Sequence, residues 1–360
     1  MSVSLRSQRP WDVRLAGAAA AIAMAGLIAM ASAASTLNPA LAVRHGAYAA
    51  IGLLVFAAAS RTNYHRWIDL SAAVYGVSLL LLLAVSAVGT MRLGATRWLS
   101  VFGVSLQPSE FAKLAVVLLL AHYLAGQPRP LPARAVLVSA GLAGLPAALI
   151  FDQPDLGSAT IVAAIWLGMA WVAGLSRRWC LSLGGGFLAA LPLAWQLLKG
   201  YQRDRLAAFI DPHADPLGAG YTIIQSTIAI GSGQFWGRGW FSGTQNQLNF
   251  LPERHSDFIF SVIGEEWGFL GCAVVIAAFV MLLFGLIRIA LETSEPQGRL
   301  LATGIGCWIA YQAFVNMGMV MGLLPVVGVP LPLVSYGGSS MVMLWLTLGL
   351  AQSVRRASRE

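Results

Sequence analysis

The feature that most constrains this chain is a series of apolar segments, each close to the length that crosses a lipid bilayer. A helix of about 20 apolar residues spans the hydrocarbon core. Hydrophobic residues make up 58% and charged residues 11% of the 360 residues, and the mean hydropathy is +0.72. The sequence therefore predicts an all-α polytopic membrane protein, a single membrane domain over residues 1–360. Its ten predicted spans are 15–34, 45–60, 69–89, 107–124, 135–151, 158–176, 179–198, 266–287, 300–323 and 339–353.

The basic residues predict the orientation of these spans, because Lys and Arg are enriched in cytoplasmic loops. If the N-terminus is cytoplasmic, an even number of spans returns the C-terminus to the same side. Fourteen of the 23 basic residues then lie in cytoplasmic segments: Arg6, Arg9, Arg14, Arg61, Arg66, Arg129, Arg134, Arg177, Arg178, Arg288, Arg299, Arg355, Arg356 and Arg359. We expect a multi-pass protein of the cytoplasmic (inner) membrane. The net charge of +8 reflects this topology and contact with anionic lipids, and no nucleic-acid partner is expected.

The N-terminal segment allows two interpretations. A basic start, an apolar stretch and Ala-Ser-Ala at 31–33 resemble a secretory signal peptide with its cleavage site. The apolar stretch is longer than a usual signal core, and its removal would leave nine spans, so we expect an uncleaved first span. Cys180, Cys272 and Cys307 stand singly in apolar segments, without the spacing of a disulfide or metal site. We expect them to be packing residues.

One long segment, residues 199–265, separates the seventh span from the eighth. We expect it to form a large extracytoplasmic loop. Pro212, Pro216, Gly218 and Gly220 predict a break in any long helix there. Residues 222–240 are rich in apolar and small side chains and predict an amphipathic piece on the bilayer surface, followed by a glycine-rich turn.

The stretch LPERHSDFIF, residues 251–260, concentrates charge next to apolar residues. A carboxylate at Asp257 would be partly desolvated at the membrane boundary, which raises its pKa and suits a proton acceptor. The alternative is that Asp257 caps a helix beginning at Phe258. Glu253, Arg254 and His255 fit a solvated interfacial cluster equally well. Glu265 and Glu266 fit acidic residues at the start of a helix, which the helix dipole favours.

A second charged pair lies inside the predicted fourth span, QPSEFAKLAVVLLLA. Glu110 and Lys113 stand three residues apart, on one face of the predicted helix, where they can pair. Ionisable groups inside a span normally face a protein interior or a wet cavity and indicate function. The alternative is a structural ion pair that holds helices together.

Two further segments attract attention outside the regular spans. In DQPDLGSA, Asp152 and Asp155 have oxygen ligands suited to a divalent cation, but a loop that caps the sixth span explains them as well. The segment MGLLPVVGVPLPLVSYGGSSM, residues 321–341, carries three prolines and four helix-breaking glycines at membrane depth. Irregular backbone at that depth must be buried in protein or line a cavity. It predicts a re-entrant segment, with a tight loop between the last two spans as the alternative.

Four of these motifs resemble a known family in their order along the chain. QPSEFAKL, QPDLGSA, LPERHSDFIFSVIGEEWG and PLPLVSYGGSS closely resemble the signatures of the SEDS proteins, the RodA/FtsW family of bacterial cell-wall polymerases. The resemblance covers essentially the whole chain. Arg254 and the preceding TQNQLNF are similar to the RodA elongation branch, which maintains cell shape. Ser256 and Trp267 depart from the common Thr and Leu, and neither change removes a charged group.

The resemblance implies a peptidoglycan glycosyltransferase that polymerises lipid II on the outer face of the membrane. Asp257 matches the family's essential carboxylate. We expect it to deprotonate the 4-hydroxyl of the acceptor N-acetylglucosamine, which then attacks the donor N-acetylmuramic acid with inversion. Mg²⁺ or Mn²⁺ is an expected aid to the diphosphate, and no organic cofactor is expected. The expected substrate-binding or supporting residues are Glu110, Lys113, Asp155, Arg205, Arg238, Glu253, Arg254, His255, Ser335 and Tyr336. Among them, the candidates to offset the diphosphate charge are Arg205, Arg238, Arg254 and Lys113.

Two other classes of function fit some of the same features. A transporter that flips lipid II would also need intramembrane charges and broken helices. The charges here concentrate towards the predicted outer boundary, and no internal repeat is visible, which favours the enzyme. A scaffold for a partner synthase is compatible with either. The chain has no Ser-x-x-Lys motif of a transpeptidase, and the resemblance implies a class B penicillin-binding protein as the crosslinking partner.

Overall fold

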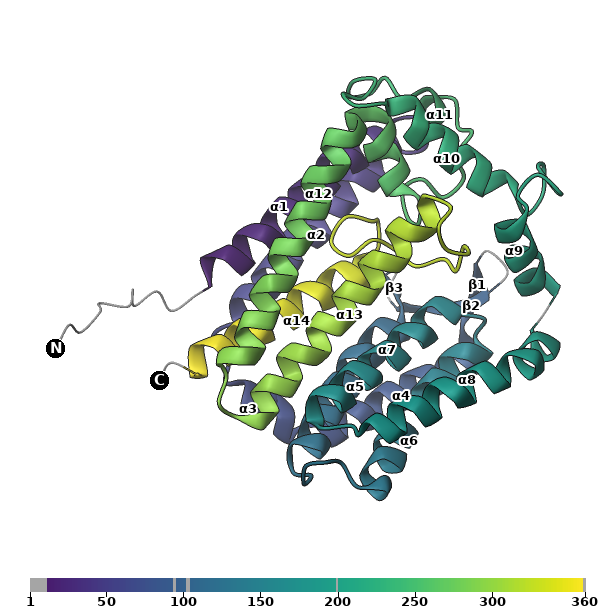
Figure 1. The fold of residues 1–360 in the computed structure, drawn as a ribbon. Helices are drawn as coiled ribbons and strands as arrows, with labels where there is room; N and C mark the ends of the chain where they lie inside the picture. The colour runs from purple at the N-terminus through teal and green to yellow at the C-terminus, as the bar shows by residue number, and fades with distance from the viewer. Residues whose placement is uncertain (1–11, 93–94, 102–103, 199, 359–360) are drawn as a thin grey trace.

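The computed structural model describes residues 12–92, 95–101, 104–198 and 200–358, and it is built almost entirely of helices (Figure 1). The predicted all-α class is confirmed. Arg6, Arg9 and Arg359, assigned above to cytoplasmic segments, lie outside the described residues, as does residue 199 at the start of the long loop.

Each predicted span coincides with one helix. The ten are α1 (Val13–Ser35), α2 (Ala40–Ala59), α4 (Ser71–Val88), α5 (Pro108–Ala125), α6 (Ala133–Asp152), α7 (Leu156–Ala173), α8 (Arg177–Leu197), α12 (Ile259–Glu292), α13 (Pro296–Val320) and α14 (Gly338–Ala357). Among the described residues, α1, α2, α5, α6, α7, α12 and α13 are long and apolar enough to cross a membrane. The three shortest predicted ranges correspond to helices of 20 residues each. The predicted start of the eighth span at 266 is wrong, because the apolar, buried residues 259–263 already belong to α12.

Helix α1 is an integral part of the bundle. It packs along α12 and beside α2, and its buried face runs from Leu15 to Ala34. Helix α2 packs closely on α14, where Phe56 meets Trp345 edge to face at a ring distance of 5.5 Å. The first apolar segment therefore contributes to the core, as expected for an uncleaved span. Cys180, Cys272 and Cys307 are all free, as predicted.

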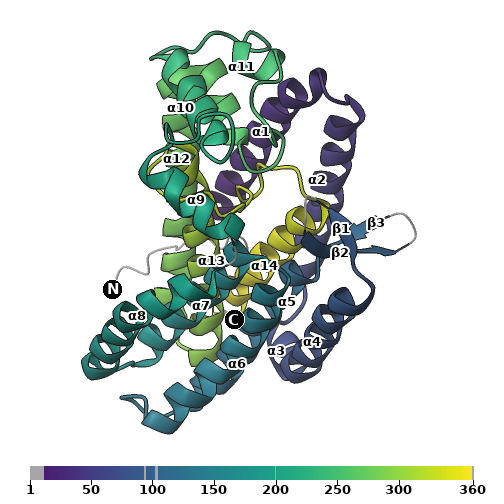
Figure 2. The same ribbon diagram turned by 90° about the vertical axis from the view of Figure 1, so that its right-hand side faces the viewer.

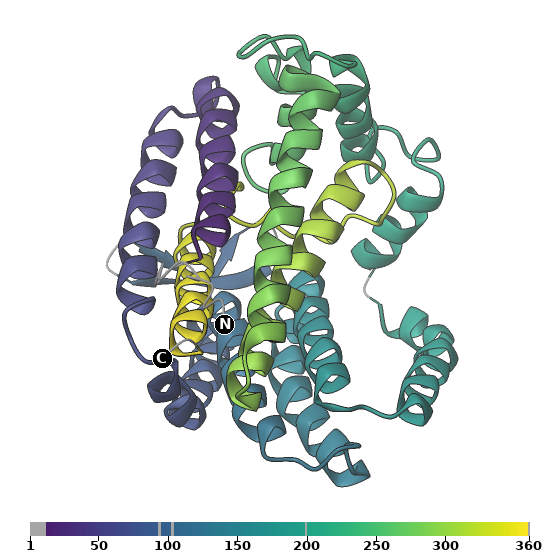
Figure 3. The same cartoon turned by 60° about the vertical axis from the view of Figure 1, so that its left-hand side comes forward.

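The long loop folds into short helices at one end of the bundle. They are α9 (Gly200–Ile210), α10 (Tyr221–Gly233) and α11 (Thr244–Gln247), and the Pro- and Gly-rich stretch ends α9 and precedes α10 as predicted. Helix α3 (Tyr64–Asp69) and the end of α14 lie at the opposite end (Figures 1 and 2). Helices α8 and α9 lie at the periphery, on the side away from α1 and α2 (Figure 3).

Helix α12 is broken at Gly268, whose φ of 66° and ψ of −161° are not helical. Residues 234–239, which follow α10, supply substitute hydrogen bonds across the break. Two N–H groups of this segment donate to α12 carbonyls before the break, and two N–H groups of α12 after the break donate back. The four bonds are Arg238 N to Glu265 O (3.0 Å), Gly239 N to Glu266 O (3.0 Å), Phe269 N to Gln234 O (2.8 Å) and Leu270 N to Phe235 O (3.2 Å).

A small antiparallel sheet lies between α4 and α5, where the sequence predicted only a connection. Its strands are β1 (Thr90–Arg92), β2 (Ala95–Val101) and β3 (Val104–Leu106), in the order β1-β2-β3. Trp98 pairs with Thr90, and Leu99 pairs with Leu106. The sheet matters because it carries Arg97 towards the site described below.

The segment between α13 and α14 passes through the interior without forming a helix. Val329, Leu331 and Val334 are almost completely buried. A Cβ added at Gly26 of α1 would lie 2.7 Å from the Cα of Val334, so the segment packs directly on that helix. This is the arrangement predicted for a re-entrant segment, not for an exposed tight loop.

Candidate functional site

Asp257 lies at the end of a compact turn that leads into α12. The turn is closed by N–H groups of Ser256 and Phe258, which donate to Glu253 O over 3.0 and 3.3 Å. The residue at the N-cap of α12 is Phe258, and no side chain caps the helix. The alternative interpretation of Asp257 as a helix cap is therefore wrong, and its half-buried carboxylate does not serve the helix.

The surroundings of Asp257 favour its protonated form. Burial raises the pKa of the carboxyl to about 6, and the nearby carboxylates of Glu253 and Asp155 contribute in the same direction. The guanidinium groups of Arg205 and Arg97 lower the pKa. The pKa of Asp257 is thus raised, as predicted from its place at an apolar boundary.

Glu253 holds an unusual backbone conformation beside Asp257. Its φ is 48°, in the left-handed region that residues other than glycine rarely adopt. Ser256 Oγ donates to Glu253 Oε2 over 3.0 Å, and His255 Nε2 lies 4.0 Å from the same oxygen. Burial lowers the pKa of His255. Its carbonyl accepts from Tyr336 N over 2.9 Å, so the charged turn contacts the segment between α13 and α14.

Two side chains of α13 attach this segment to the site. Asn316 Nδ2 donates to Asp257 O over 2.8 Å and to Val329 O over 2.7 Å. Gln312 Nε2 donates to Pro330 O over 2.8 Å. A Cβ added at Gly328, where φ is 70°, would lie 3.3 Å from Asp257 Oδ2. The bare backbone of Gly328 therefore forms one boundary of the site next to the carboxylate.

Glu110 and Lys113 form a buried ion pair behind this segment. Lys113 Nζ lies 2.7 Å from Glu110 Oε1 and 3.4 Å from Gln312 Oε1, and it stands 4.8 Å from the centre of the Trp308 ring. Both side chains are almost fully buried. The predicted pairing is therefore present. The side-chain amide of Gln312 connects it to the site, because this amide contacts Lys113 and also binds the Pro330 carbonyl. Ser335, predicted to support the site, accepts from Leu331 N over 2.7 Å and stabilises the same segment.

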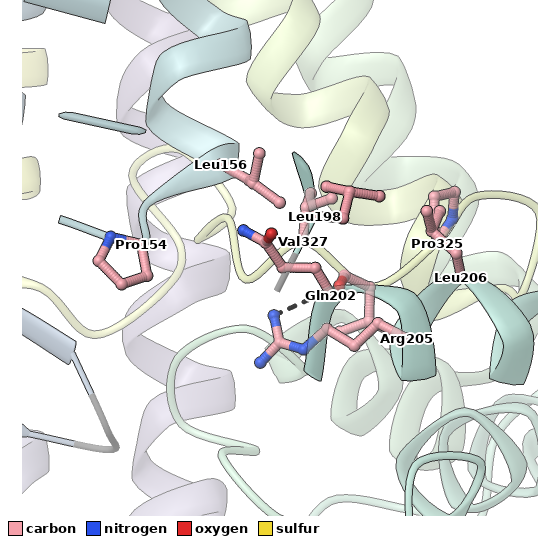
Figure 4. A pocket seen from close by; sticks show the side chains of 9 residues that line it. Pro154, Leu156, Leu198, Gln202, Arg205, Leu206, Pro325 and Val327 are labelled. Atoms are coloured by element: carbon pink, nitrogen blue, oxygen red, sulfur yellow. Dashed lines mark hydrogen bonds between the residues drawn. The ribbon is translucent and has the colours of Figure 1, made fainter. Parts of the chain in front are cut away.

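Arg205 approaches the site from α9. Its Nη1 donates to Val326 O over 3.4 Å, and a Cβ added at Gly328 would lie 4.0 Å from that nitrogen. Beside it lies a small, mostly apolar pocket of about 60 Å³ (Figure 4), lined by Pro154, Leu156, Leu198, Gln202, Arg205, Leu206, Pro325, Val326 and Val327.

Arg97 is a site residue that the sequence analysis missed. It extends from β2, where Nε donates to Gln153 O over 3.3 Å and Nη2 donates to Pro154 O. Its Nη1 lies 3.9 Å from Asp155 Oδ1. Asp155 caps α7 by accepting from Ser158 N over 3.1 Å, so the capping alternative holds for this residue. The only sequence signal was a cation beside Trp98 near a predicted membrane boundary.

The other two predicted arginines belong to different clusters. Arg254 is 1% exposed, and its guanidinium binds Ala33 O over 3.0 Å and Thr36 Oγ1 over 2.5 Å at the end of α1. The interpretation of Arg254 as part of a solvated cluster is wrong. Arg238 is exposed and binds Ser232 O and Thr244 Oγ1, over 3.2 and 3.4 Å.

Glu265 and Glu266 lie near Arg238 inside α12. They are buried, and they accept hydrogen bonds from the segment around α11 and from Ser32. The prediction of helix-start charges was wrong, because α12 begins earlier, at Ile259. Their hydrogen bonds hold the segment around α11 against α1.

The described residues include no group of three or more His, Cys, Asp or Glu side chains arranged to hold a metal ion. The carboxylate of Asp155 is engaged with α7 and Arg97, and that of Glu253 with Ser256. A preformed Mg²⁺ or Mn²⁺ site does not fit this arrangement. The expected divalent cation stays a prediction.

Comparisons with known proteins place this chain in a family. A family model described as cell cycle protein, named for FtsW, RodA and SpoVE, matches residues 14–360. The peptidoglycan glycosyltransferase MrdB of Escherichia coli K12 is 41% identical over 307 residues, 85% of this chain and 83% of that protein. The probable peptidoglycan glycosyltransferase FtsW of Thioalkalivibrio sulfidiphilus is 39% identical over 328 residues, 88% of this chain and 80% of that protein.

Solved structures agree over nearly the full length. The crystal structure of the rod shape determining protein RodA of Thermus thermophilus has a TM-score of 0.74 at 31% identity, covering 97% of this chain and 98% of that one. A chain from work on the structural coordination of polymerization and crosslinking by a peptidoglycan synthase complex has a TM-score of 0.84 at 36% identity, covering 97% and 99%. The chain belongs to the FtsW/RodA/SpoVE family, the SEDS proteins.

Proposed function

We propose that this chain is a peptidoglycan glycosyltransferase that polymerises lipid II into glycan strands during cell elongation, with Asp257 as the general base. The family relationship supports the reaction class. The observation that supports the base is the half-buried Asp257 carboxyl, which has a pKa raised to about 6 and carries no helix-capping bond. A carboxylate with a pKa just below neutral pH is ionised when needed and still basic enough to accept a proton.

The proposed step is a displacement at the anomeric carbon of the donor N-acetylmuramic acid. Asp257 takes the proton of the acceptor 4-hydroxyl as its oxygen forms the new bond to that carbon. The bond from the carbon to the diphosphate oxygen breaks, and its electron pair leaves with the polyprenyl diphosphate. The diphosphate is already a good leaving group, so one carboxylate suffices where glycoside hydrolysis ordinarily uses two.

The surrounding residues have supporting roles in this proposal. The buried Glu110–Lys113 pair holds Gln312, which binds the backbone of the segment facing Asp257. Of the four cations predicted to face the diphosphate, Arg205 lies beside Asp257. Lys113 and Arg254 are buried, and each binds other groups of the protein. The backbone N–H of Arg238 donates to Glu265 O, away from Asp257.

The setting of the reaction is also proposed. The long loop and Asp257 face the outside of the cytoplasmic membrane, where lipid II is consumed, and both termini are cytoplasmic. A class B penicillin-binding protein crosslinks the product. The likeness to a chain in a peptidoglycan synthase complex supports a partner of this kind.

The test is polymerisation of labelled lipid II by the purified protein in detergent, alone and with the partner. Wild type should convert lipid II to polymer, and Asp257→Ala and Asp257→Asn should abolish conversion without loss of folding. A flippase would leave lipid II unconsumed, because detergent offers no two sides to cross. Intact lipid II after prolonged incubation of wild type with partner and Mg²⁺ would therefore favour the transporter. Full activity of Asp257→Asn would remove the base from the proposal.

A further inference from the structure

Arg97 is held firmly yet keeps part of its hydrogen-bonding capacity. Its Nε and Nη2 are bound to the carbonyls of Gln153 and Pro154. Its Nη1 is 3.9 Å from Asp155 Oδ1, beyond hydrogen-bond distance. A guanidinium carries five N–H donors in one plane, so Nη1 retains donors without an acceptor among the described residues. The side chain is 25% exposed, which leaves these donors accessible to a ligand.

Arg205 comes to the same place from a different element. The turn at Pro154 links the two arginines, because Arg97 binds the Pro154 carbonyl and Arg205 lines a pocket with the Pro154 ring (Figure 4). The guanidinium of Arg205 and the carboxylate of Asp257 both lie within 4.0 Å of the position that a Gly328 Cβ would occupy. Both arginines also lower the pKa of Asp257, so both charges act at its carboxylate.

We propose that Arg97 and Arg205 together bind the diphosphate of the lipid-linked donor, one guanidinium from β2 and one from α9. The inference rests on the proposed function, because only a lipid-diphosphate donor brings such a group beside Asp257. The planar guanidinium fork matches phosphate oxygens, and the two phosphoryl groups provide one partner for each arginine. As the bond to the anomeric carbon breaks, negative charge grows on the diphosphate, and fixed N–H donors stabilise it without rearranging.

The neighbouring carboxylates do not prevent this binding. Asp155 accepts from the N-terminus of α7 and faces Arg97, and Glu253 accepts from Ser256. Asp257 itself becomes neutral as it takes the acceptor proton. The leaving group therefore becomes the more negative partner of the two guanidinium groups as the reaction proceeds.

The test compares Arg97→Lys and Arg205→Lys with wild type. Lysine keeps the positive charge but lacks the fork. Binding of undecaprenyl diphosphate and undecaprenyl monophosphate is measured on the purified full chain carrying Asp257→Asn, so that turnover is absent. Each change should weaken diphosphate binding by about tenfold or more, since a hydrogen bond to a charged group is lost. Monophosphate binding should weaken much less in at least one of the two variants, because a single phosphoryl group meets only one of the arginines. Arg203→Lys, on the same helix α9, is the matched control and should change neither affinity.

Four outcomes separate the possibilities. Unchanged diphosphate affinity in both variants would overturn the assignment, as would losses that are equal for diphosphate and monophosphate in both variants. Loss of folding in Arg97→Lys, seen as a lower unfolding temperature, would leave Arg205→Lys to decide, because Arg205 is exposed. If wild type binds diphosphate through these residues but never polymerises lipid II, the proposed reaction fails while the diphosphate site stands.

Discussion

At the scale of single residues, the charge state of Asp257 controls the proposed reaction. The base must be ionised, so the rate of polymerisation should rise with pH through a midpoint near the pKa of about 6. Because the Glu253 carboxylate raises this pKa, Glu253→Gln should lower it and move the acid limb of the profile to lower pH. The measurement is kcat against pH. Asp211→Asn, an exposed carboxylate of the loop, should leave the midpoint in place. An unmoved midpoint in Glu253→Gln would contradict the assigned influence.

The Glu110–Lys113 pair gives a second residue-scale prediction. Loss of either partner strands a buried charge, which costs about 3–5 kcal/mol, whereas loss of both strands none. Glu110→Gln and Lys113→Met should each destabilise the protein severely, and the double variant should lose much less than the sum. A double-mutant cycle on unfolding free energy measures this coupling. The exposed Arg288–Glu292 pair is the control, with an expected coupling of about 1 kcal/mol or less. Additive losses at Glu110 and Lys113 would show that they act independently.

At the scale of elements, the break in α12 depends on one glycine. Gly268 has a φ of 66°, and a Cβ there would lie 2.3 Å from the Gly237 nitrogen. Gly268→Ala should destabilise the protein by about 1–3 kcal/mol or more, because both the backbone strain and the collision with main chain oppose it. Thermal unfolding is the readout. Gly17→Ala, in an exposed helical position with nothing within 4 Å, should be neutral or stabilising. Equal stability of both variants would show that the break can be relieved cheaply.

The long helices of the fold could be predicted from the sequence, but the break in α12 could not. The ten long helices were predictable, because an apolar chain in lipid must satisfy its own backbone, and a helix does so locally. A lone glycine in a helical pattern is usually tolerated. The break at Gly268 forms because the carbonyls of Gln234 and Phe235 arrive from a distant segment, which no local pattern records.

In the candidate site, too, some residues could be predicted from the sequence and others could not. Asp257 and the Glu110–Lys113 pair were predictable, since a charge in an apolar stretch is costly and needs a reason. Arg97 was not, because it lies in a polar connection where a cation is ordinary. Its importance arises from β2, which brings it to the turn at Pro154 and Asp155. Arg254 looked like a surface charge for the same reason, and only the fold reveals its contact with α1.

At the scale of the whole molecule, orientation in the membrane can be tested by cysteine labelling. In a background without Cys180, Cys272 and Cys307, single cysteines replace residues at either end of the bundle. Arg61→Cys and Arg177→Cys should react only from the cytoplasm, and Ala214→Cys, between α9 and α10, only from outside. A membrane-impermeant thiol reagent applied to intact cells and to inverted vesicles makes the comparison. Reversed accessibility would put Asp257 on the wrong face for wall synthesis.

The amide of Asn316 has a consequence for repeated turnover. A polymerase must release the polyprenyl diphosphate and admit a new lipid II after every addition. Asn316 binds Asp257 O and Val329 O with the same nitrogen, so separating these two walls breaks at least one hydrogen bond, about 0.5–1.5 kcal/mol. The backbone of Asp257 and the wall opposite it should therefore move together with α13 when the site admits and releases its substrates.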